Sequence, residues 1–142
     1  MTRPDAPSPQ RGFTLLELLV VVVIIGVLAA YVGPRYFTQI GKSEQGTARM
    51  QIDALAKALE TYRIDTGRYP GTEQGLAVLM TRPADESKWA GPYLVKAVPK
   101  DPWGRPYLYR SPGADGTDFD LRSLGRDGQA GGEGDNADLS YR

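Results

Sequence analysis

The segment from Phe13 to Val32 constrains the fold more than any other part of the chain. It contains 20 residues that are almost all apolar, and no charged residue lies between Glu17 and Arg35. As a helix it would be about 30 Å long, roughly the thickness of the hydrocarbon core of a bilayer. Arg3 and Arg11 precede it. The positive-inside rule therefore predicts a cytoplasmic N-terminus, with the rest of the chain outside.

Glu17 helps to distinguish two interpretations of this segment. One is a secretory signal cleaved near Leu28-Ala29-Ala30. However, the apolar run is longer than the core of an ordinary signal. A carboxylate within the membrane also costs about 2.5–3.5 kcal/mol on insertion scales, so it should have a partner or a function. Both points count against a cleaved signal, and a plain transmembrane anchor would have no reason to keep the carboxylate.

The composition excludes several classes of function. The 142 residues suffice for one compact domain. The 17 basic residues balance 17 acidic ones, so there is no broad basic field for nucleic acid. The chain has no cysteine and no histidine, which excludes disulfides, thiolate catalysis and catalytic centres built on histidine. We expect a protein that is not an enzyme; if it binds a metal, oxygen ligands favour calcium or magnesium.

A second helical pattern follows the apolar segment. The pair Gly33-Pro34 should bend a helix or melt it locally rather than end it. Beyond it, apolar residues repeat at helical spacing until Thr66-Gly67, where glycine suits a left-handed cap. Sustained heptads, which would indicate a coiled coil, are absent. We predict one long helix, with a transmembrane part at 13–33 and an amphipathic part at 34–66. The stripe residues are Ile52, Leu55, Leu59 and Tyr62.

The sequence Gly41-Lys42-Ser43 is similar to the end of a phosphate-binding P-loop. That motif needs a glycine five residues before Gly41, and Tyr36 stands there. It also needs a preceding strand. We therefore expect no nucleotide binding.

Residues 67–142 are predicted to form a small head. Thr72 can cap a short helix at 73–80. Frequent proline and glycine residues separate short apolar runs, which predict strands of an antiparallel sheet at 93–95, 107–109 and 119–121. Aromatic residues in the head are expected to anchor its core and turns rather than to stack on a ligand. They are Tyr69, Trp103, Tyr107 and Tyr109.

The stretch from Gly125 to Asp138 contains five glycines, four acids and one base. Composition alone favours disorder, because nothing in it can pack in a core. Calcium binding is the alternative: glycine lets carbonyl groups turn inward, and clustered carboxylates repel one another until a cation neutralises them. The stretch is not an EF-hand, since Gly131 has no side chain at a position where that motif needs an oxygen ligand.

The sequence RGFTLLEL, from Arg11 to Leu18, resembles the prepilin-type signal of type IV pilins, pseudopilins and their archaeal relatives. The resemblance implies that a prepilin peptidase removes a leader at 1–12 by cutting between Gly12 and Phe13. The same enzyme would then methylate the new amine of Phe13. The resemblance also implies that Glu17 pairs with the N-terminal amine of a neighbouring subunit during assembly, which gives this carboxylate a partner.

Further motifs between Arg11 and Leu139 resemble the major pseudopilin family of the type II secretion system. They are Tyr69-Pro70, Thr72–Leu76, Asp101–Gly104 with Pro106-Tyr107, and Ser123–Gly125 with Asp127-Gly128.

The resemblance implies a calcium ion in the loop at 124–138. One further carbonyl between residues 129 and 134 would help to complete its shell. The implied ligands are the Leu124 carbonyl and the carboxylates of Asp127, Asp135 and Asp138.

The implied fold is α+β and pilin-like. A long N-terminal helix, hydrophobic in its first half, would pack on a small antiparallel sheet with a C-terminal calcium loop. The implied protein is the major structural subunit of a pseudopilus, which polymerises from the inner membrane into a periplasmic filament. That filament would help to drive folded proteins through an outer-membrane secretin.

The expected partners are further copies of the chain, minor pseudopilins, the prepilin peptidase and an inner-membrane assembly platform. The chain would cross the inner membrane once, with its N-terminus in the cytoplasm and its head in the periplasm. Two alternatives stay open: a type IV pilin of a surface or motility pilus, and a monomeric membrane-anchored calcium-binding protein.

Overall fold

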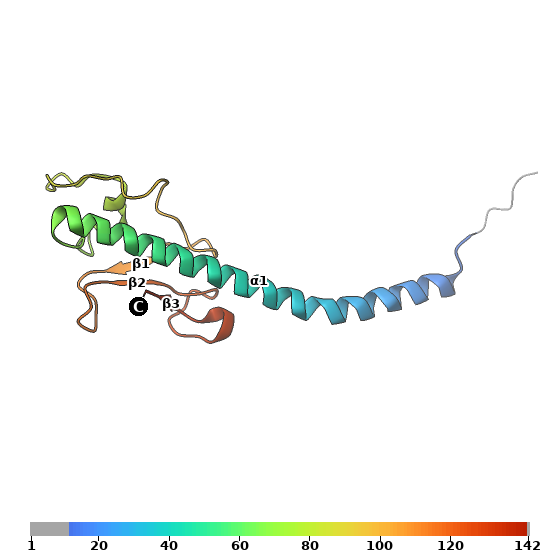
Figure 1. The fold of residues 1–142 in the computed structure, drawn as a ribbon. Coiled ribbons are helices and arrows are strands. Elements are labelled where there is room, and N and C mark those ends of the chain that lie inside the picture. The colour runs from blue at the N-terminus through green and yellow to red at the C-terminus, as the bar shows by residue number, and fades with distance from the viewer. Residues whose placement is uncertain (1–11, 142) are drawn as a thin grey trace, which may run out of the picture. The chain divides into compact units, whose positions relative to one another are not determined.

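The computed structural model describes residues 12–141 (Figure 1). The chain divides into two compact units, Met1–Gln39 and Ile40–Arg142. One helix, α1 at Leu15–Thr66, has 52 residues and belongs to both units. The predicted leader lies outside the described residues except for Gly12.

The first unit contains the apolar half of α1. The run Leu15–Pro34 has 20 residues and a mean hydropathy of 2.9, and none of it is buried within the chain. By length and composition it can cross a membrane. Gly33 and Pro34 both lie inside α1, so the pair does not end the helix. The bend or local melting expected at this pair stays a prediction.

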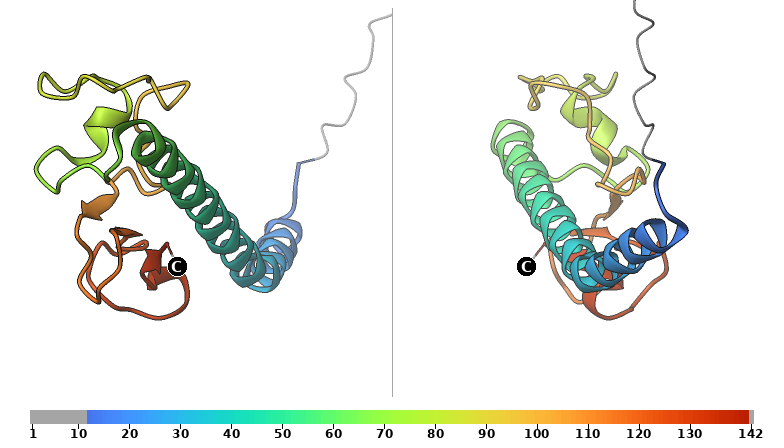
Figure 2. Two further views of the ribbon diagram at one scale, coloured as in Figure 1. Left: turned by 60° about the vertical axis from the view of Figure 1, so that its left-hand side comes forward. Right: turned by 90° about the vertical axis from the view of Figure 1, so that its right-hand side faces the viewer.

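The second half of α1 forms one side of the core of the head. The predicted stripe is confirmed, since all four of its residues are at most 2% exposed. Figure 2 shows the strands and loops of the head beside this half of α1. The core residues that other segments contribute are Leu76, Val78, Leu79, Tyr107, Phe119, Leu121 and Leu139.

The end of α1 also follows the prediction. The helix ends at Thr66, and Gly67 follows with a φ of +83°. Glycine adopts this left-handed conformation without the strain that a side chain would cause. The Gly67 N–H donates to the Arg63 carbonyl, with an N···O distance of 2.7 Å.

The head contains an antiparallel sheet in which β2 is the central strand. Tyr109 of β1 lies opposite Leu121 of β2, and Ser123 of β2 lies opposite Leu139 of β3. The pairing of β3 with β2 ties the C-terminal loop back to the sheet. Together with α1, the sheet confirms the α+β prediction. The strands are β1 at Leu108–Arg110, β2 at Asp120–Ser123 and β3 at Leu139–Ser140.

The first of the three predicted strands, at 93–95, is wrong, whereas the other two correspond to β1 and β2 with shifted ends. Tyr93 is fixed by other bonds: its N–H donates to the Leu79 carbonyl at 2.7 Å and its hydroxyl to the Asp65 carboxylate at 2.9 Å. Val95 is fully exposed. A short apolar run in the sequence therefore need not form a strand. The sequence pattern also misses β3, because two residues show no alternation.

The predicted short helix of the head is present, but Thr72 does not cap it. The element η1 is a 3₁₀-helix at Gly75–Leu79, inside the range 73–80 where a short helix was expected. Gly75 has a φ of +59°, opposite in sign to a right-handed helix, so the helix does not extend back to Thr72. Thr72 instead bonds to Ser111: its Oγ1 donates to the Ser111 carbonyl and accepts from the Ser111 N–H, each at 3.0 Å.

Candidate functional site

Thr14 and Glu17 form a capping box at the N-terminus of α1. Thr14 directly precedes the first helical residue, Leu15. The N–H and the Oγ1 of Thr14 both donate to Glu17 Oε2 at 2.9 Å, and the Glu17 N–H donates to Thr14 Oγ1 at 3.2 Å. These bonds satisfy donors that the start of a helix leaves open. The Thr-x-x-Glu pattern signals this cap in a sequence, and our sequence predictions miss it.

The capping box places the Glu17 carboxylate in an exposed position at the positive end of the helix dipole. Gly12 and Phe13, on either side of the predicted cleavage point, precede it in a non-helical segment. Both are exposed, Phe13 at 78%. A peptidase can reach a peptide bond in such a segment more readily than one inside a helix. Cleavage and N-methylation stay predictions.

Beyond the capping box, α1 presents apolar side chains on all sides. From Leu15 to Val32, the large apolar residues are each at least 46% exposed. A helix that is apolar all round needs a membrane or other helices to cover it. The described residues of this chain do not bury it. This half of α1 is therefore a surface for lipid or for other helices.

Asp101 fastens the start of the C-terminal loop to the head. The residue is 4% exposed. It accepts hydrogen bonds from the N–H groups of Trp103 and Arg105, at 3.2 and 2.7 Å, and from the Ser123 hydroxyl at 2.7 Å. The Ser123 oxygen in turn accepts from the Gly125 N–H at 3.3 Å. Because donors surround the buried carboxylate, it can hold the turn that follows Asp101 against the end of β2.

Arg105 continues this fastening into the loop itself. Its guanidinium donates to the Gly125 carbonyl at 2.9 Å and to the Arg126 carbonyl at 3.1 Å. The guanidinium also lies against Gly128: a Cβ added to Gly128 would lie 2.5 Å from the Arg105 guanidinium carbon. The first turn of the loop thus has a protein side chain that holds two of its carbonyl groups.

The predicted calcium ligands all lie in or beside the loop, but their carboxylates do not converge. Asp127 is exposed, and its Oδ1 accepts a backbone N–H two residues further along at 3.0 Å. Asp135 lies against α1, 3.9 Å from the Arg126 guanidinium. Leu124 and Asp138 are half-buried. Among residues 12–141, no group of three or more such side chains lies close enough together to hold a metal ion.

The donor chemistry of the loop nevertheless fits calcium. Asp138 Oδ1 is buried and has no hydrogen-bond partner within the described part of the chain, which is costly for a carboxylate oxygen. Gly132 has a φ of +82°, and a Cβ there would lie 2.5 Å from the Asn136 carbonyl oxygen. Glycine is therefore needed for the backbone to approach itself this closely. Carboxylate and carbonyl oxygens are the ligands that calcium prefers, and Asp138 is the best placed of them.

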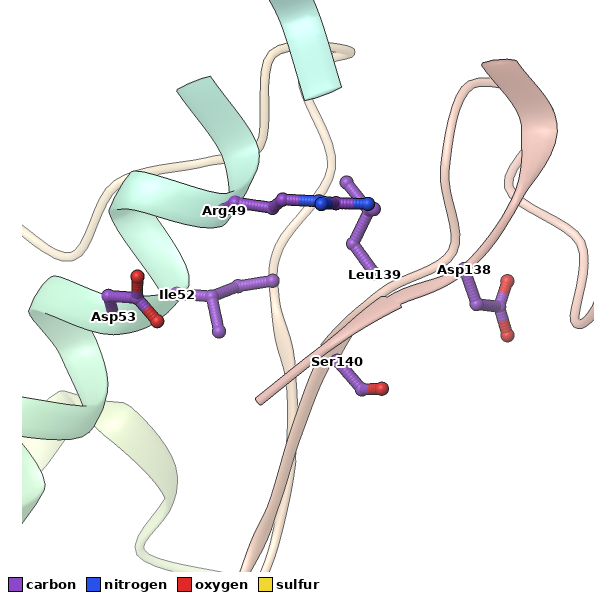
Figure 3. A pocket seen from close by; sticks show the side chains of 6 residues that line it. All are labelled: Arg49, Ile52, Asp53, Asp138, Leu139 and Ser140. Atoms are coloured by element: carbon purple, nitrogen blue, oxygen red, sulfur yellow. The ribbon is translucent and has the colours of Figure 1, made fainter. Parts of the chain in front are cut away.

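A groove of about 370 Å³ lies between α1 and β3, beside Asp138. Figure 3 shows the Arg49 side chain reaching from α1 toward Leu139, whereas the Asp138 carboxylate points away from α1. The walls of the groove mix apolar, acidic and basic groups, so they do not select one class of ligand. We assign it no function. The groove is lined by Arg49, Ile52, Asp53, Asp138, Leu139 and Ser140.

The aromatic side chains of the head serve packing, as predicted. The buried Tyr107 donates its hydroxyl hydrogen to Gln51 Oε1 at 2.5 Å, and the Tyr109 hydroxyl donates to the Pro70 carbonyl at 2.8 Å. Burial raises the pKa of Tyr109 to about 12 and also raises the pKa of Tyr107. These rings join the sheet side of the head to α1 and to the segment that follows it.

The sequence matches two described families. Residues 35–142 match the family described as "Type II secretion system (T2SS), protein G". Residues 7–33 match the "Prokaryotic N-terminal methylation motif". The first match alone covers more than half of the chain.

Named relatives and one solved structure agree with these matches. The type II secretion system core protein G of Vibrio cholerae is 48% identical over 133 residues, which cover 92% of this chain and 90% of the relative. That of Pseudomonas aeruginosa is 44% identical over 133 residues, covering 92% and 93%. The crystal structure of the major pseudopilin from the type 2 secretion system of enterohaemorrhagic Escherichia coli is 34% identical, with a TM-score of 0.58, and covers 70% of this chain and 86% of that one. The chain therefore belongs to the protein G family of the type II secretion system, the family of the major pseudopilins, and has its pilin-like fold.

Proposed function

We propose that this chain is the major structural subunit of the type II secretion pseudopilus. It polymerises from the inner membrane into a periplasmic filament that helps to drive folded proteins through the outer-membrane secretin. The observation that carries this proposal is the apolar half of α1, which is exposed from Leu15 to Val32 in a chain whose head has a core of its own. Such a helix is stable in a membrane before assembly and among other helices after it.

The topology and the partners follow from the same proposal. The N-terminus lies in the cytoplasm, where the prepilin peptidase removes the leader, and the head lies in the periplasm. Minor pseudopilins and the inner-membrane assembly platform are the further partners of the growing filament. The match of residues 7–33 to a methylation motif and the basic residue Arg11 before the apolar run support this orientation.

Processing can be tested directly on the protein isolated from its native membrane. Mass spectrometry should find Phe13 at the N-terminus with one added methyl group. An N-terminus at Met1, or one just after Ala30, would contradict processing by a prepilin peptidase.

Glu17 is the residue to which we give the assembly role, pairing with the N-terminal amine of Phe13 in a neighbouring subunit. The variants Glu17→Gln and Glu17→Ala separate this role from helix capping. Glutamine carries no charge but can still complete a capping box. Alanine carries no charge and cannot complete one. We expect both variants to enter the membrane almost normally and to assemble poorly, as measured by membrane fractionation and by cross-linking of filaments. Wild-type assembly of the Gln variant would contradict charge pairing.

We further propose that the C-terminal loop binds one calcium ion through the carboxylates of Asp127 and Asp138 and the carbonyl of Leu124. The family pattern adds a carbonyl between residues 129 and 134, and also Asp135, which lies against α1 in this structure. When bound, calcium supplies the positive charge that offsets the carboxylates and so orders the loop. The buried oxygen of Asp138 without a hydrogen-bond partner supports this role.

Thermal unfolding with calcium and with a chelator tests the calcium proposal. A cation that binds only the folded state raises the Tm. The wild type should therefore melt at a higher temperature in calcium. Asp127→Ala should lower the Tm in calcium and change it little in chelator. Identical melting of the wild type in both conditions would rule the metal out.

A further inference from the structure

The C-terminal loop contacts α1 at a point that the proposed function does not use. Gly41 is buried, and a Cβ placed on it would overlap the carboxylate of Asp135. One turn further along the helix, Gln45 Nε2 donates to the Gly134 carbonyl at 2.5 Å. Residues four apart lie on the same face of a helix. Gly41 and Gln45 therefore form one docking face on α1 for the 3₁₀-helix η2, Gly134–Asn136.

Glycine in the middle of a helix needs a physical reason, because it is the poorest helix former after proline. Two glycines of α1 within the head unit allow a comparison. Around Gly46 no atom lies within 4 Å of an added Cβ, whereas at Gly41 the Asp135 side chain occupies that space. The reason for Gly41 is therefore steric: it leaves room for the Asp135 carboxylate.

The surroundings of Asp135 differ from those expected of a metal ligand. Its carboxylate faces the backbone of α1 on one side and lies 3.9 Å from the Arg126 guanidinium. A positive side chain so close competes with a cation for the same carboxylate. The carboxylate oxygen of the loop that is buried without a partner belongs to Asp138.

We propose that Asp135 docks the C-terminal loop on α1, in a notch that Gly41 provides, and that it is not a ligand of the calcium ion. The docking depends only on contacts within this chain. The second part rests on the calcium role proposed above. In this arrangement the Gly41 notch attaches the loop near its end without a metal, as Arg105 does at its first turn.

Alanine variants of the two glycines, Gly41 and Gly46, test the docking. They are compared in the full mature chain in detergent, with chelator present so that no metal contributes. Gly41→Ala should lower the Tm by several degrees, although alanine favours the helix. The matched control Gly46→Ala should leave the Tm unchanged or raise it. In an Asp135→Ala background, Gly41→Ala should lower the Tm much less, because the overlapping carboxylate is gone. An equal loss in both backgrounds, or a Gly41→Ala variant that melts as high as Gly46→Ala, would overturn the docking.

Calcium titration calorimetry on the same preparations tests the assignment of Asp135. We expect Asp135→Asn to keep the wild-type Kd within about threefold, and Asp138→Asn to weaken binding by about tenfold or more. Equal weakening by the two variants would place Asp135 among the ligands. If the wild type binds no calcium, the calcium proposal fails, and the glycine pair still decides whether Asp135 docks the loop.

Discussion

Among single residues, Asp101 has the most buried carboxylate of the described part of the head. It is 4% exposed and accepts hydrogen bonds from two backbone N–H groups and one hydroxyl. Asp101→Ala would leave these three donors without their acceptor. We expect this to cost about 3 kcal/mol of unfolding free energy. The exposed control Asp115→Ala should stay within about 0.5 kcal/mol of the wild type. Urea unfolding measures both, and equal stability of the two variants would contradict the importance of the Asp101 bonds.

The buried hydroxyl of Tyr109 should make the unfolding free energy depend on pH in the alkaline range. Burial raises its pKa to about 12. Because the folded state favours the protonated hydroxyl, this contribution to stability is complete below the ordinary tyrosine pKa of about 10 and is lost as pH rises from about 10 to 12. The unfolding free energy should therefore fall across this interval. Tyr109→Phe should make the fall shallower, and an equally steep fall in this variant would contradict the role of the Tyr109 hydroxyl.

The sequence suggests residue roles where the signal is local, and not where the role depends on tertiary contacts. The prepilin-type motif predicts roles for Gly12, Phe13 and Glu17, which lie within a few positions of one another, and these roles stay predictions. In contrast, no local pattern shows that Thr72 bonds to Ser111, or that a carboxylate of the loop lies against α1. These contacts exist because the fold brings distant segments together.

At the scale of elements, α1 is stabilised by its buried stripe rather than by its exposed face. Leu55 is 1% exposed, whereas Ile64 on the same helix is 80% exposed. Leu55→Ala should therefore cost about 2–5 kcal/mol of unfolding free energy, because it removes buried methyl groups and leaves a cavity. Ile64→Ala should cost less than about 0.5 kcal/mol. Chemical denaturation of the detergent-solubilised chain measures both values, and similar losses would place the core elsewhere.

Long elements could be predicted from the sequence better than short ones. The spacing of the stripe and the glycine after Thr66 locate the second half of α1 and its end, because many turns repeat the same pattern. The strand expected at 93–95 is wrong, and the short helix expected at 73–80 is a 3₁₀-helix that begins only at Gly75. In such short segments one bond or one φ angle outweighs the pattern, as Tyr93 and Gly75 show.

For the whole molecule, the division into two units predicts independent folding of the head. Among the described residues, the hydrophobic core begins at Ala48, beyond the boundary between Gln39 and Ile40. A fragment of residues 40–142 should therefore be a monomer that melts in one cooperative transition, because it keeps the whole core and loses the exposed apolar surface. Sedimentation velocity and calorimetry check this. A fragment that aggregates or lacks a transition would show that the first unit supports the head.

The large-scale organisation of the chain can be predicted from its sequence better than the side-chain arrangement in the C-terminal loop. The apolar segment and the amphipathic stripe predict that one helix serves both the membrane and the head, and the structure has that helix. The predicted ligand set names residues of one loop, and the sequence does not give the orientations of their side chains. Asp127, Asp135 and Asp138 lie within twelve positions, yet their side chains do not converge. Side-chain direction in a glycine-rich loop depends on φ angles that the residue types permit but do not specify.

The continuity of α1 has a mechanical consequence. Because α1 runs without a break from Leu15 to Thr66, a force applied to one half is transmitted to the other through the covalent backbone and its ladder of hydrogen bonds. Proline has no N–H to contribute to that ladder, and the glycine before it is the residue with the least resistance to torsion. Under tension, extension should therefore concentrate in the turn around Gly33 and Pro34. The head could then carry a load with its packed core undeformed.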